Sequence, residues 1–169
     1  KVVDRIKKAV KNKEKICIYG DYDVDGVASV SIMLKYFNSI NYPVSFYIPD
    51  RVEEGYGLNR EAVEKTANDG TELIITVDCG ISSIDEVEFA NSLGVDVIIT
   101  DHHECQEILP DAYAIINPKQ ENCTYPFSEL CGCGLALKLI QALTPEGVFK
   151  KSIYEYLHIT AIATIADVV

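Results

Sequence analysis

The sequence has no tryptophan, one methionine and three histidines. It also has no apolar run of about 18 residues, so no segment is long enough to cross a membrane as a helix. No secretory signal peptide opens the chain, although it begins at Lys1 rather than at methionine, which leaves a trimmed N-terminus open. With 48% hydrophobic and 24% charged residues among 169, the composition is that of an ordinary globular domain, and we expect a cytoplasmic protein without a membrane partner.

Positive charge is also scarce. Fifteen cations against 26 acids give a net charge of −11, which argues against a free-standing nucleic-acid-binding protein. The cations are unevenly placed, because seven of the fifteen fall within residues 1–15, where the apolar Val2, Ile6 and Val10 recur every four positions. This pattern predicts a basic amphipathic helix over residues 1–14. Such a helix usually presents solvated charge, and its alternative use is contact with phosphates.

Six cysteines are present, but they do not form the framework of a small disulfide-rich protein. They are scattered through strand ends and a loop, so we expect reduced thiols and no disulfides. Only the stretch CGCG, residues 131–134, brings two of them together. A C-x-C pair without a second pair has poor spacing for zinc, and the sequence therefore gives little support to a structural metal there.

Strand-like and helix-like segments alternate along the chain. The predicted strands cover residues 15–20, 44–48, 73–78, 96–101 and 114–117, and the predicted helices cover residues 27–39, 59–68, 83–94, 135–143 and 153–167. Strands that are apolar almost throughout, separated by helices of about ten residues, indicate a mainly parallel sheet. The sequence therefore predicts one α/β domain over residues 1–169, with helices on both faces of the sheet and additional helices at the C-terminus.

The stretch GDYDVDGVA, residues 20–28, places Asp21, Asp23 and Asp25 at alternate positions before a glycine. An EF-hand calcium loop begins in the same way, but its twelfth position requires a bidentate glutamate, and Ile32 stands there. A solvated turn that caps the next helix is a second alternative, which accounts for one or two of the acids. Three acids at the end of a strand repel one another, and a cation among them relieves that repulsion.

Ionisable or amide side chains follow four of the predicted strands: Asp21; Asp78; Asp101, His102 and His103; and Asn117 with Lys119. Ligands of parallel sheets bind outside the carboxyl ends of the strands, so these side chains are expected at one edge. Because carboxylates outnumber imidazoles, the edge favours Mn²⁺ or Mg²⁺. A second ion about 3.5–4 Å from the first, bridged by one aspartate, would relieve the crowding and suit hydrolysis of a phosphoester or phosphoanhydride.

Four short phrases carry a family resemblance: DYDVDG (21–26), VDCG (77–80), TDHH (100–103) and IADVV (165–169). In this order they resemble motifs one to four of the DHH phosphoesterase superfamily. The first phrase, together with EGYGL (54–58) and INPK (116–119), is more similar to RecJ-type single-stranded-DNA exonucleases than to relatives whose first motif contains a histidine. The resemblance covers residues 15–169 and implies a Rossmann-like DHH domain.

The resemblance also implies roles for individual residues. It implies that two Mn²⁺ or Mg²⁺ ions are held by six side chains: Asp21, Asp23, Asp25, Asp78, His102 and Asp167. Asp78 would bridge the ions, and His103 and Asp101 would be catalytic residues. His103 would approach the scissile phosphate rather than a metal, while Asp101 would orient His102. Four candidates for phosphate contacts complete the predicted site: Arg51, Tyr56, Asn117 and Lys119.

RecJ-like enzymes carry a DHH-associated domain, and often an oligonucleotide-binding fold, beyond the fourth motif. We therefore expect such domains after residue 169 and weak activity from residues 1–169 alone. The leading hypothesis is the catalytic domain of a 5′→3′ single-stranded-DNA exonuclease in DNA repair and recombination, with a single-strand-binding protein or a helicase as candidate partners. The alternatives are a DHH hydrolase of short oligoribonucleotides, cyclic dinucleotides or adenosine bisphosphate, and an inactive DHH scaffold in a replication assembly. The lack of a histidine before Asp23 disfavours the first alternative, and the intact acids and histidines disfavour the second.

Overall fold

The computed structural model describes all residues, Lys1–Val169, as an α/β domain around one parallel sheet. The sheet consists of β1 (Ile16–Gly20), β2 (Ser45–Tyr47), β3 (Leu73–Val77), β4 (Asp96–Thr100) and β5 (Ala114–Ile116). Their order in space is β2-β1-β3-β4-β5, and every neighbouring pair is parallel. The predicted fold class is therefore confirmed, and every one of the five predicted strands is present.

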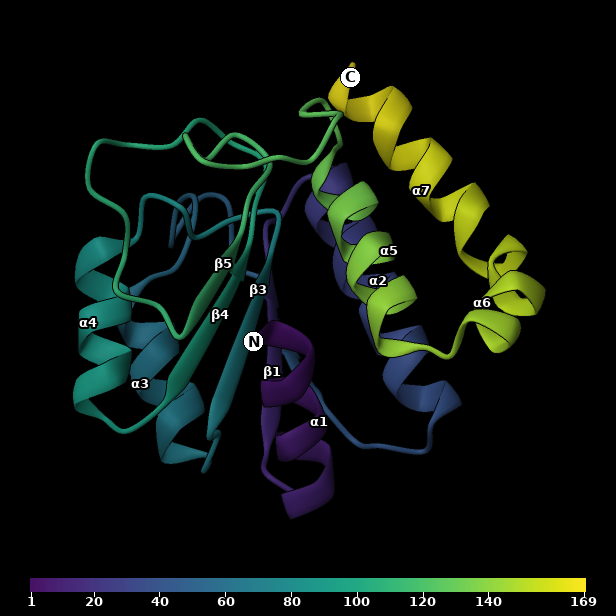
Figure 1. The fold of residues 1–169 in the computed structure, drawn as a ribbon. Coiled ribbons are helices and arrows are strands. Elements are labelled where there is room, and N and C mark those ends of the chain that lie inside the picture. Colours follow the sequence, from purple (N-terminus) through teal and green to yellow (C-terminus); the bar gives the residue numbers. More distant parts are fainter.

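Helices cover both faces of the sheet (Figure 1). One face carries α3 (Arg60–Asn68) and α4 (Ile84–Ser92), and the other carries α1 (Val2–Asn12), α2 (Val24–Ser39) and α5 (Gly132–Leu143). Two further helices, α6 (Glu146–Ser152) and α7 (Tyr154–Asp167), form an outer layer, in which α7 packs on α2 and α5. Two buried apolar clusters, one on each face, hold these layers together, because the central strands are apolar on both sides.

Two helices begin three residues earlier than the sequence pattern predicts. Helix α2 begins at Val24, because the Asp23 side chain accepts a hydrogen bond from the Gly26 N–H and so caps the helix. Helix α5 begins at Gly132, and its capping residue is Cys131, whose sulfur accepts from the Gly134 N–H. Apolar periodicity does not detect a first turn that contains glycine with an acid, as in α2, or with a cysteine, as in α5. Helix α6 was not predicted at all.

The direction in which successive strands are added to the sheet reverses at β1. After β1 the chain passes to β2 on one side, and after β2 it crosses to β3 on the other side of β1. In open parallel sheets a crevice for ligands forms at this position, outside the carboxyl ends of the two strands. The residues that follow β1 and β3 are Asp21 and Asp78, so the topology places two acids at the crevice.

No helix of the structure is both long enough and apolar enough to span a bilayer.

Candidate metal centre

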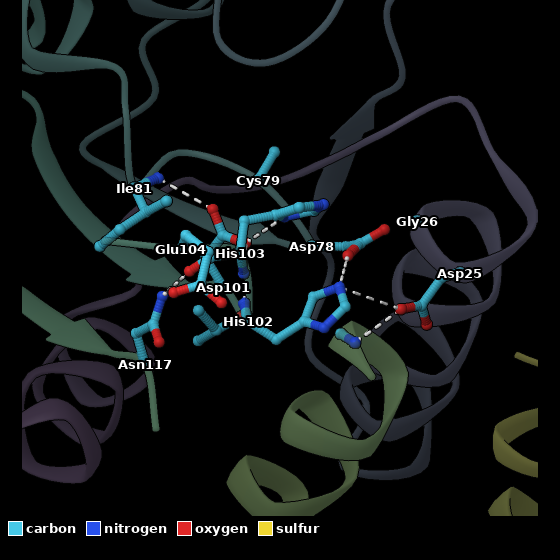
Figure 2. Close-up of polar contacts among 12 residues, drawn as sticks. Asp25, Gly26, Asp78, Cys79, Ile81, Asp101, His102, His103, Glu104 and Asn117 are labelled. Atoms are coloured by element: carbon cyan, nitrogen blue, oxygen red, sulfur yellow. Dashed lines mark hydrogen bonds and ion pairs between the residues drawn. The ribbon is translucent and has the colours of Figure 1, made fainter. Parts of the chain in front are cut away.

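Three neighbouring strands deliver the predicted ligands to one edge of the sheet. Asp21 follows β1, Asp78 follows β3, and Asp101 and His102 follow β4. These four residues are buried, and Asp21 and Asp78 are only 2% and 1% exposed. Figure 2 shows the side chains of Asp78 and His102 turned toward each other at this edge. The strands therefore bring together residues that lie up to 81 positions apart in the sequence.

Asp25 reaches the same edge from the first turn of α2. It is 2% exposed, and each of its carboxylate oxygens accepts a hydrogen bond from the N-terminus of α5: Oδ2 from the Gly132 N–H at 2.6 Å and Oδ1 from the Cys133 N–H at 2.8 Å. Asp23 is exposed and caps α2 with one oxygen. The two acids of one helical turn therefore differ, because one is fixed inside the protein and the other faces solvent.

The imidazole of His102 occupies the centre of the acid cluster. Its Nε2 lies 3.1 Å from Asp78 Oδ1, 3.7 Å from Asp25 Oδ2 and 3.7 Å from Asp167 Oδ2 (Figure 2 shows the first two). Asp167 is the last residue of α7, so the outer helix layer also contributes to the cluster. Four of the six predicted metal ligands therefore lie together, because Asp25, Asp78 and Asp167 surround the Nε2 atom of His102.

The donor set fits divalent cations. Three groups have ligand atoms within 4.8 Å of one another: Asp78, His102 and His103; Asp25, His102 and Asp167; and Asp21, Asp23 and Asp78. All six predicted ligands appear in them, and Asp78 belongs to two groups, the position that a carboxylate bridging two ions would occupy. Four buried atoms of this set have no hydrogen-bond partner: Asp21 Oδ1, Asp78 Oδ1, His102 Nε2 and Asp167 Oδ2. Although His102 Nε2 and Asp78 Oδ1 are 3.1 Å apart, they are not aligned for a hydrogen bond.

Burial and mutual repulsion change the acidity of this cluster. Burial, followed by the charges of Asp25 and Asp23, raises the pKa of Asp78 to about 10. Burial likewise raises the pKa values of Asp25 and Asp21, although hydrogen bonds from backbone N–H groups oppose the change. Without a cation the site is therefore electrostatically unfavourable, and positive charge bound there would let the Asp78 carboxyl group ionise at neutral pH.

The backbone of Asp78 is unusual. Its φ of 63° lies in the left-handed region, which residues with a side chain rarely adopt, and its N–H donates to the Thr100 carbonyl at 2.9 Å. Strain of this kind persists only where the surrounding structure enforces it, and it is concentrated at functional sites. The conformation turns the Asp78 side chain toward His102 immediately after the strand ends (Figure 2).

Asp101 organises the DHH segment in a way that differs from the prediction. Its Oδ1 accepts from the N–H groups of His102 and His103 and lies 2.7 Å from His103 Nδ1, while its Oδ2 accepts from the Ile81 N–H. Asp101 therefore orients the ring of His103, and the expectation that it orients the ring of His102 is wrong. The two rings lie beside each other, with centroids 4.6 Å apart, but Nε2 of His102 faces Asp78 Oδ1 at 3.1 Å, so the His102 ring is turned toward the acid cluster rather than toward Asp101. Pairing with Asp101 raises the pKa of His103 and lowers that of Asp101.

The four predicted phosphate contacts are in different surroundings. Tyr56 lies beside His103, with its hydroxyl 3.0 Å from His103 Nδ1. Arg51 is exposed and lies over the ring of Tyr22, the residue between Asp21 and Asp23, at 5.4 Å.

Asn117 and Lys119 are already engaged within the protein. Asn117 is buried, donates to the His103 carbonyl at 2.9 Å and accepts from the Lys119 N–H, so it fixes the loop that carries His103 (Figure 2). The Lys119 ammonium pairs with Glu104 at 3.0 Å. Their roles as substrate contacts stay predictions, as do those of Arg51 and Tyr56.

The sequence analysis missed the contribution of the α5 N-terminus. Gly132 and Cys133 hold Asp25 through their backbone N–H groups, which no side-chain pattern shows. The available signal was a glycine between two cysteines immediately before an apolar helix. All six cysteines are free thiols, in agreement with the prediction of no disulfides.

Comparison with known proteins agrees with this geometry. The model of the DHH family, N-terminal domain, matches residues 15–164. The chain is 53% identical over 166 residues to the single-stranded-DNA-specific exonuclease RecJ of Bacillus subtilis, covering 98% of this chain and 20% of that relative. It is 38% identical to the RecJ protein of Escherichia coli, covering 100% of this chain and 31% of the relative. The structure of an exonuclease RecJ bound to manganese superposes with a TM-score of 0.84 at 32% identity, over 98% of this chain and 42% of that one. The chain thus spans only about a fifth to a third of the length of these two curated relatives.

Proposed function

The chain belongs to the DHH family, and on that premise we propose that it is the catalytic domain of a metal-dependent single-stranded-DNA exonuclease. The observation that supports this most strongly is the convergence of four buried, unpartnered ligand atoms, from Asp21, Asp78, His102 and Asp167, at the carboxyl edge of the sheet. The relatives named above are single-stranded-DNA-specific exonucleases, and one is named as bound to manganese.

Two divalent cations, Mn²⁺ or Mg²⁺, would be held by the six carboxylate and imidazole side chains of the cluster. Asp25, His102 and Asp167 would surround one position, Asp21 and Asp23 the other, and Asp78 would lie between them. Such a pair of ions supplies an activated water and a grip on the phosphate oxygens when bound. The protein contributes the fixed carboxylate positions and a largely buried setting in which their charges act strongly.

His103, with its partners Asp101 and Tyr56, would act on the reacting phosphate. The Asp101 carboxylate holds the His103 ring and favours its protonated form, which suits a group that stabilises negative charge on the reacting phosphate. The hydroxyl of Tyr56 is positioned to orient the same ring or to donate to a phosphate oxygen. Arg51, held over Tyr22 at the mouth of the acid cluster, is the exposed cation best placed for a neighbouring phosphate.

The direction of digestion, the biological process and the partners are further proposals. We propose 5′→3′ digestion in DNA repair and recombination in the cytoplasm, with single-stranded DNA as substrate and a single-strand-binding protein or a helicase as partner. Because the relatives are three to five times longer than this chain, we also propose that further domains hold the DNA strand. The net charge of −11 supports this division, because an acidic domain repels a polyanion away from its metal ions.

The alternatives are separable by experiment. The intact protein should be incubated with 5′-labelled and 3′-labelled single-stranded DNA and RNA in Mn²⁺, and the products should be resolved by length. Mononucleotides released from the 5′ end of DNA support the proposal. Cleavage confined to short oligoribonucleotides or to adenosine bisphosphate would favour a hydrolase of small substrates. Mn²⁺ binding without cleavage of any of these would favour the scaffold.

A further inference from the structure

The N-terminus of α5 lies against the metal centre, although none of its side chains is a predicted ligand. We infer that Gly132 is a positioning residue, which fixes Asp25 through its N–H and leaves the space that Asp78 occupies because it has no side chain. The inference rests on the proposed metal-binding function. It assigns a role to the CGCG stretch, which the sequence analysis left without one.

The first observation is the way in which Asp25 is held. Both of its oxygens are engaged by consecutive N–H groups of α5, at 2.6 and 2.8 Å, although the two segments lie more than 100 residues apart in the sequence. Hydrogen bonds from a helix N-terminus to a carboxylate are strengthened by the charge and by the helix dipole. With both oxygens anchored, the carboxylate cannot rotate, and its Oδ2 is held 3.7 Å from His102 Nε2.

The second observation is steric. A Cβ atom on Gly132 would lie 2.5 Å from Asp78 Oδ1, 2.6 Å from its Cβ and 2.7 Å from its Cγ, distances that real Cβ atoms essentially never show. Asp78 cannot easily move away, because its backbone is in the left-handed region and its N–H is bonded to the Thr100 carbonyl. Oδ1 is also the atom that faces His102 Nε2 at 3.1 Å. Any side chain at position 132 would therefore displace the proposed bridging ligand.

The third observation connects α5 to the remaining ligand. The sulfur of Cys131 lies 3.4 Å from the Thr164 hydroxyl, and the sulfur of Cys133 lies 3.6 Å from the Thr160 hydroxyl. Both threonines belong to α7, which ends at Asp167. The segment 131–133 thus binds Asp25 through its N–H groups, adjoins Asp78 at Gly132, and packs through its cysteines on the helix that ends at Asp167. The cysteines act as small buried contacts between helices rather than as metal ligands.

The test compares two alanine substitutions in the same helix. Gly132→Ala introduces the clash, whereas at Gly134 a Cβ would meet nothing closer than the Leu130 side chain at 3.3 Å. Mn²⁺ affinity of the intact protein should be measured by calorimetry, and folding of the metal-free protein by circular dichroism and thermal melting. We expect Gly132→Ala to fold but to bind Mn²⁺ at least about tenfold more weakly, the scale of a lost supporting contact. Gly134→Ala should change the affinity by less than about threefold.

The outcomes separate the inference from the proposed function. Wild-type protein that binds no Mn²⁺ would overturn the proposed function, and this inference with it. Wild-type affinity in Gly132→Ala, or equal losses in both variants, would overturn the inference alone.

If Gly132→Ala does not fold, amide hydrogen exchange replaces it. In the metal-free protein, Asp25→Ala should accelerate exchange at Gly132 and Cys133 at least about tenfold, because their acceptor is lost while the helix remains. Unchanged exchange at both amides would contradict the anchoring of Asp25 by α5.

Discussion

Buried charges at the two ends of the sheet are arranged in opposite ways. At the amino end, the Arg5 guanidinium of α1 is 4% exposed and pairs with Glu14 and Asp96, each at 2.6 Å. At the carboxyl end, Asp21, Asp25 and Asp78 are equally buried but face one another and a histidine. The buried cation at the amino end therefore has acidic partners within the chain, whereas the buried acids at the carboxyl end have no lysine or arginine partner.

This difference separates a structural ion cluster from a ligand site. Although the Arg5–Glu14 pair is not aligned as a hydrogen bond, its opposite charges compensate each other. At the carboxyl end no lysine or arginine pairs with Asp21, Asp25 or Asp78, and the compensation must come from outside the chain. The basic residues of α1 cannot supply it, because this helix lies toward the amino end of the sheet (Figure 1).

The largest effect is expected from removing the bridging carboxylate. Asp78→Ala should abolish binding of Mn²⁺ and lower exonuclease turnover by about 10⁴-fold or more, because ligands of a two-metal centre act as a unit. Calorimetry and a single-stranded-DNA cleavage assay on the intact protein check both parts. Retention of two bound ions in the variant would show that Asp78 is not the bridge.

A smaller effect on catalysis, and none on metal binding, is expected at the histidine that Asp101 holds. His103→Ala should lower turnover by about 10²–10⁴-fold, the range for a lost acid, base or transition-state donor. Mn²⁺ affinity should persist, because Asp25, Asp78 and His102 remain. If affinity falls together with turnover, His103 is a ligand, as its grouping with Asp78 and His102 would also permit.

At the amino end, substitution should affect stability alone. Arg5→Ala leaves Glu14, whose side chain is only 12% exposed, without its counter-charge, and should lower the free energy of unfolding by about 3 kcal/mol. Denaturant titration measures this loss. Lys7→Ala, on the exposed face of the same helix, is the matched control and should change stability by less than about 0.5 kcal/mol. A loss of Mn²⁺ affinity in Arg5→Ala would contradict the separation of the two ends.

The smallest effect is a gain of stability in the absence of metal. The pKa of Asp78 is about 10 in the folded protein and about 4 in the unfolded chain, so the folded state binds more protons between these values. Stability of the metal-free protein should therefore fall as the pH rises from about 4 toward 10. Asp78→Asn removes this titration and should stabilise the metal-free protein at pH 7 by about 1–3 kcal/mol. Parallel pH profiles for the variant and the wild type would show that Asp78 carries no such cost.

Much of the fold, and the convergence of the predicted ligands at one edge of the sheet, was predictable from the sequence. The strands are nearly continuous apolar runs, and an acid directly follows each of the first, third and fourth, so the position of these acids at one edge follows from parallel topology alone. Asp25 was predicted as a ligand even though the helix that carries it was predicted to start only at residue 27, beyond Asp25 itself. Its place depended on the spacing of the motif rather than on the helix boundary.

The remaining features depend on contacts between distant segments. That Asp101 holds His103 rather than His102 depends on which way each ring turns after β4, and no residue pattern encodes this. The anchoring of Asp25 by Gly132 uses backbone N–H groups, which every sequence possesses. The burial of Arg5 was also hidden, because its position in a basic, amphipathic stretch resembles that of its exposed neighbours.

The most direct test of the role of the buried acids at the carboxyl end is a calorimetric titration of the intact protein with Mn²⁺ near neutral pH, with Ca²⁺ as comparison. We predict two Mn²⁺ ions for each chain, bound more tightly than Ca²⁺, and proton release on binding, because the pKa of Asp78, raised to about 10, must fall when a cation joins it. The absence of Mn²⁺ binding, or a site selective for Ca²⁺, would contradict the proposal that this edge of the sheet is a two-metal centre.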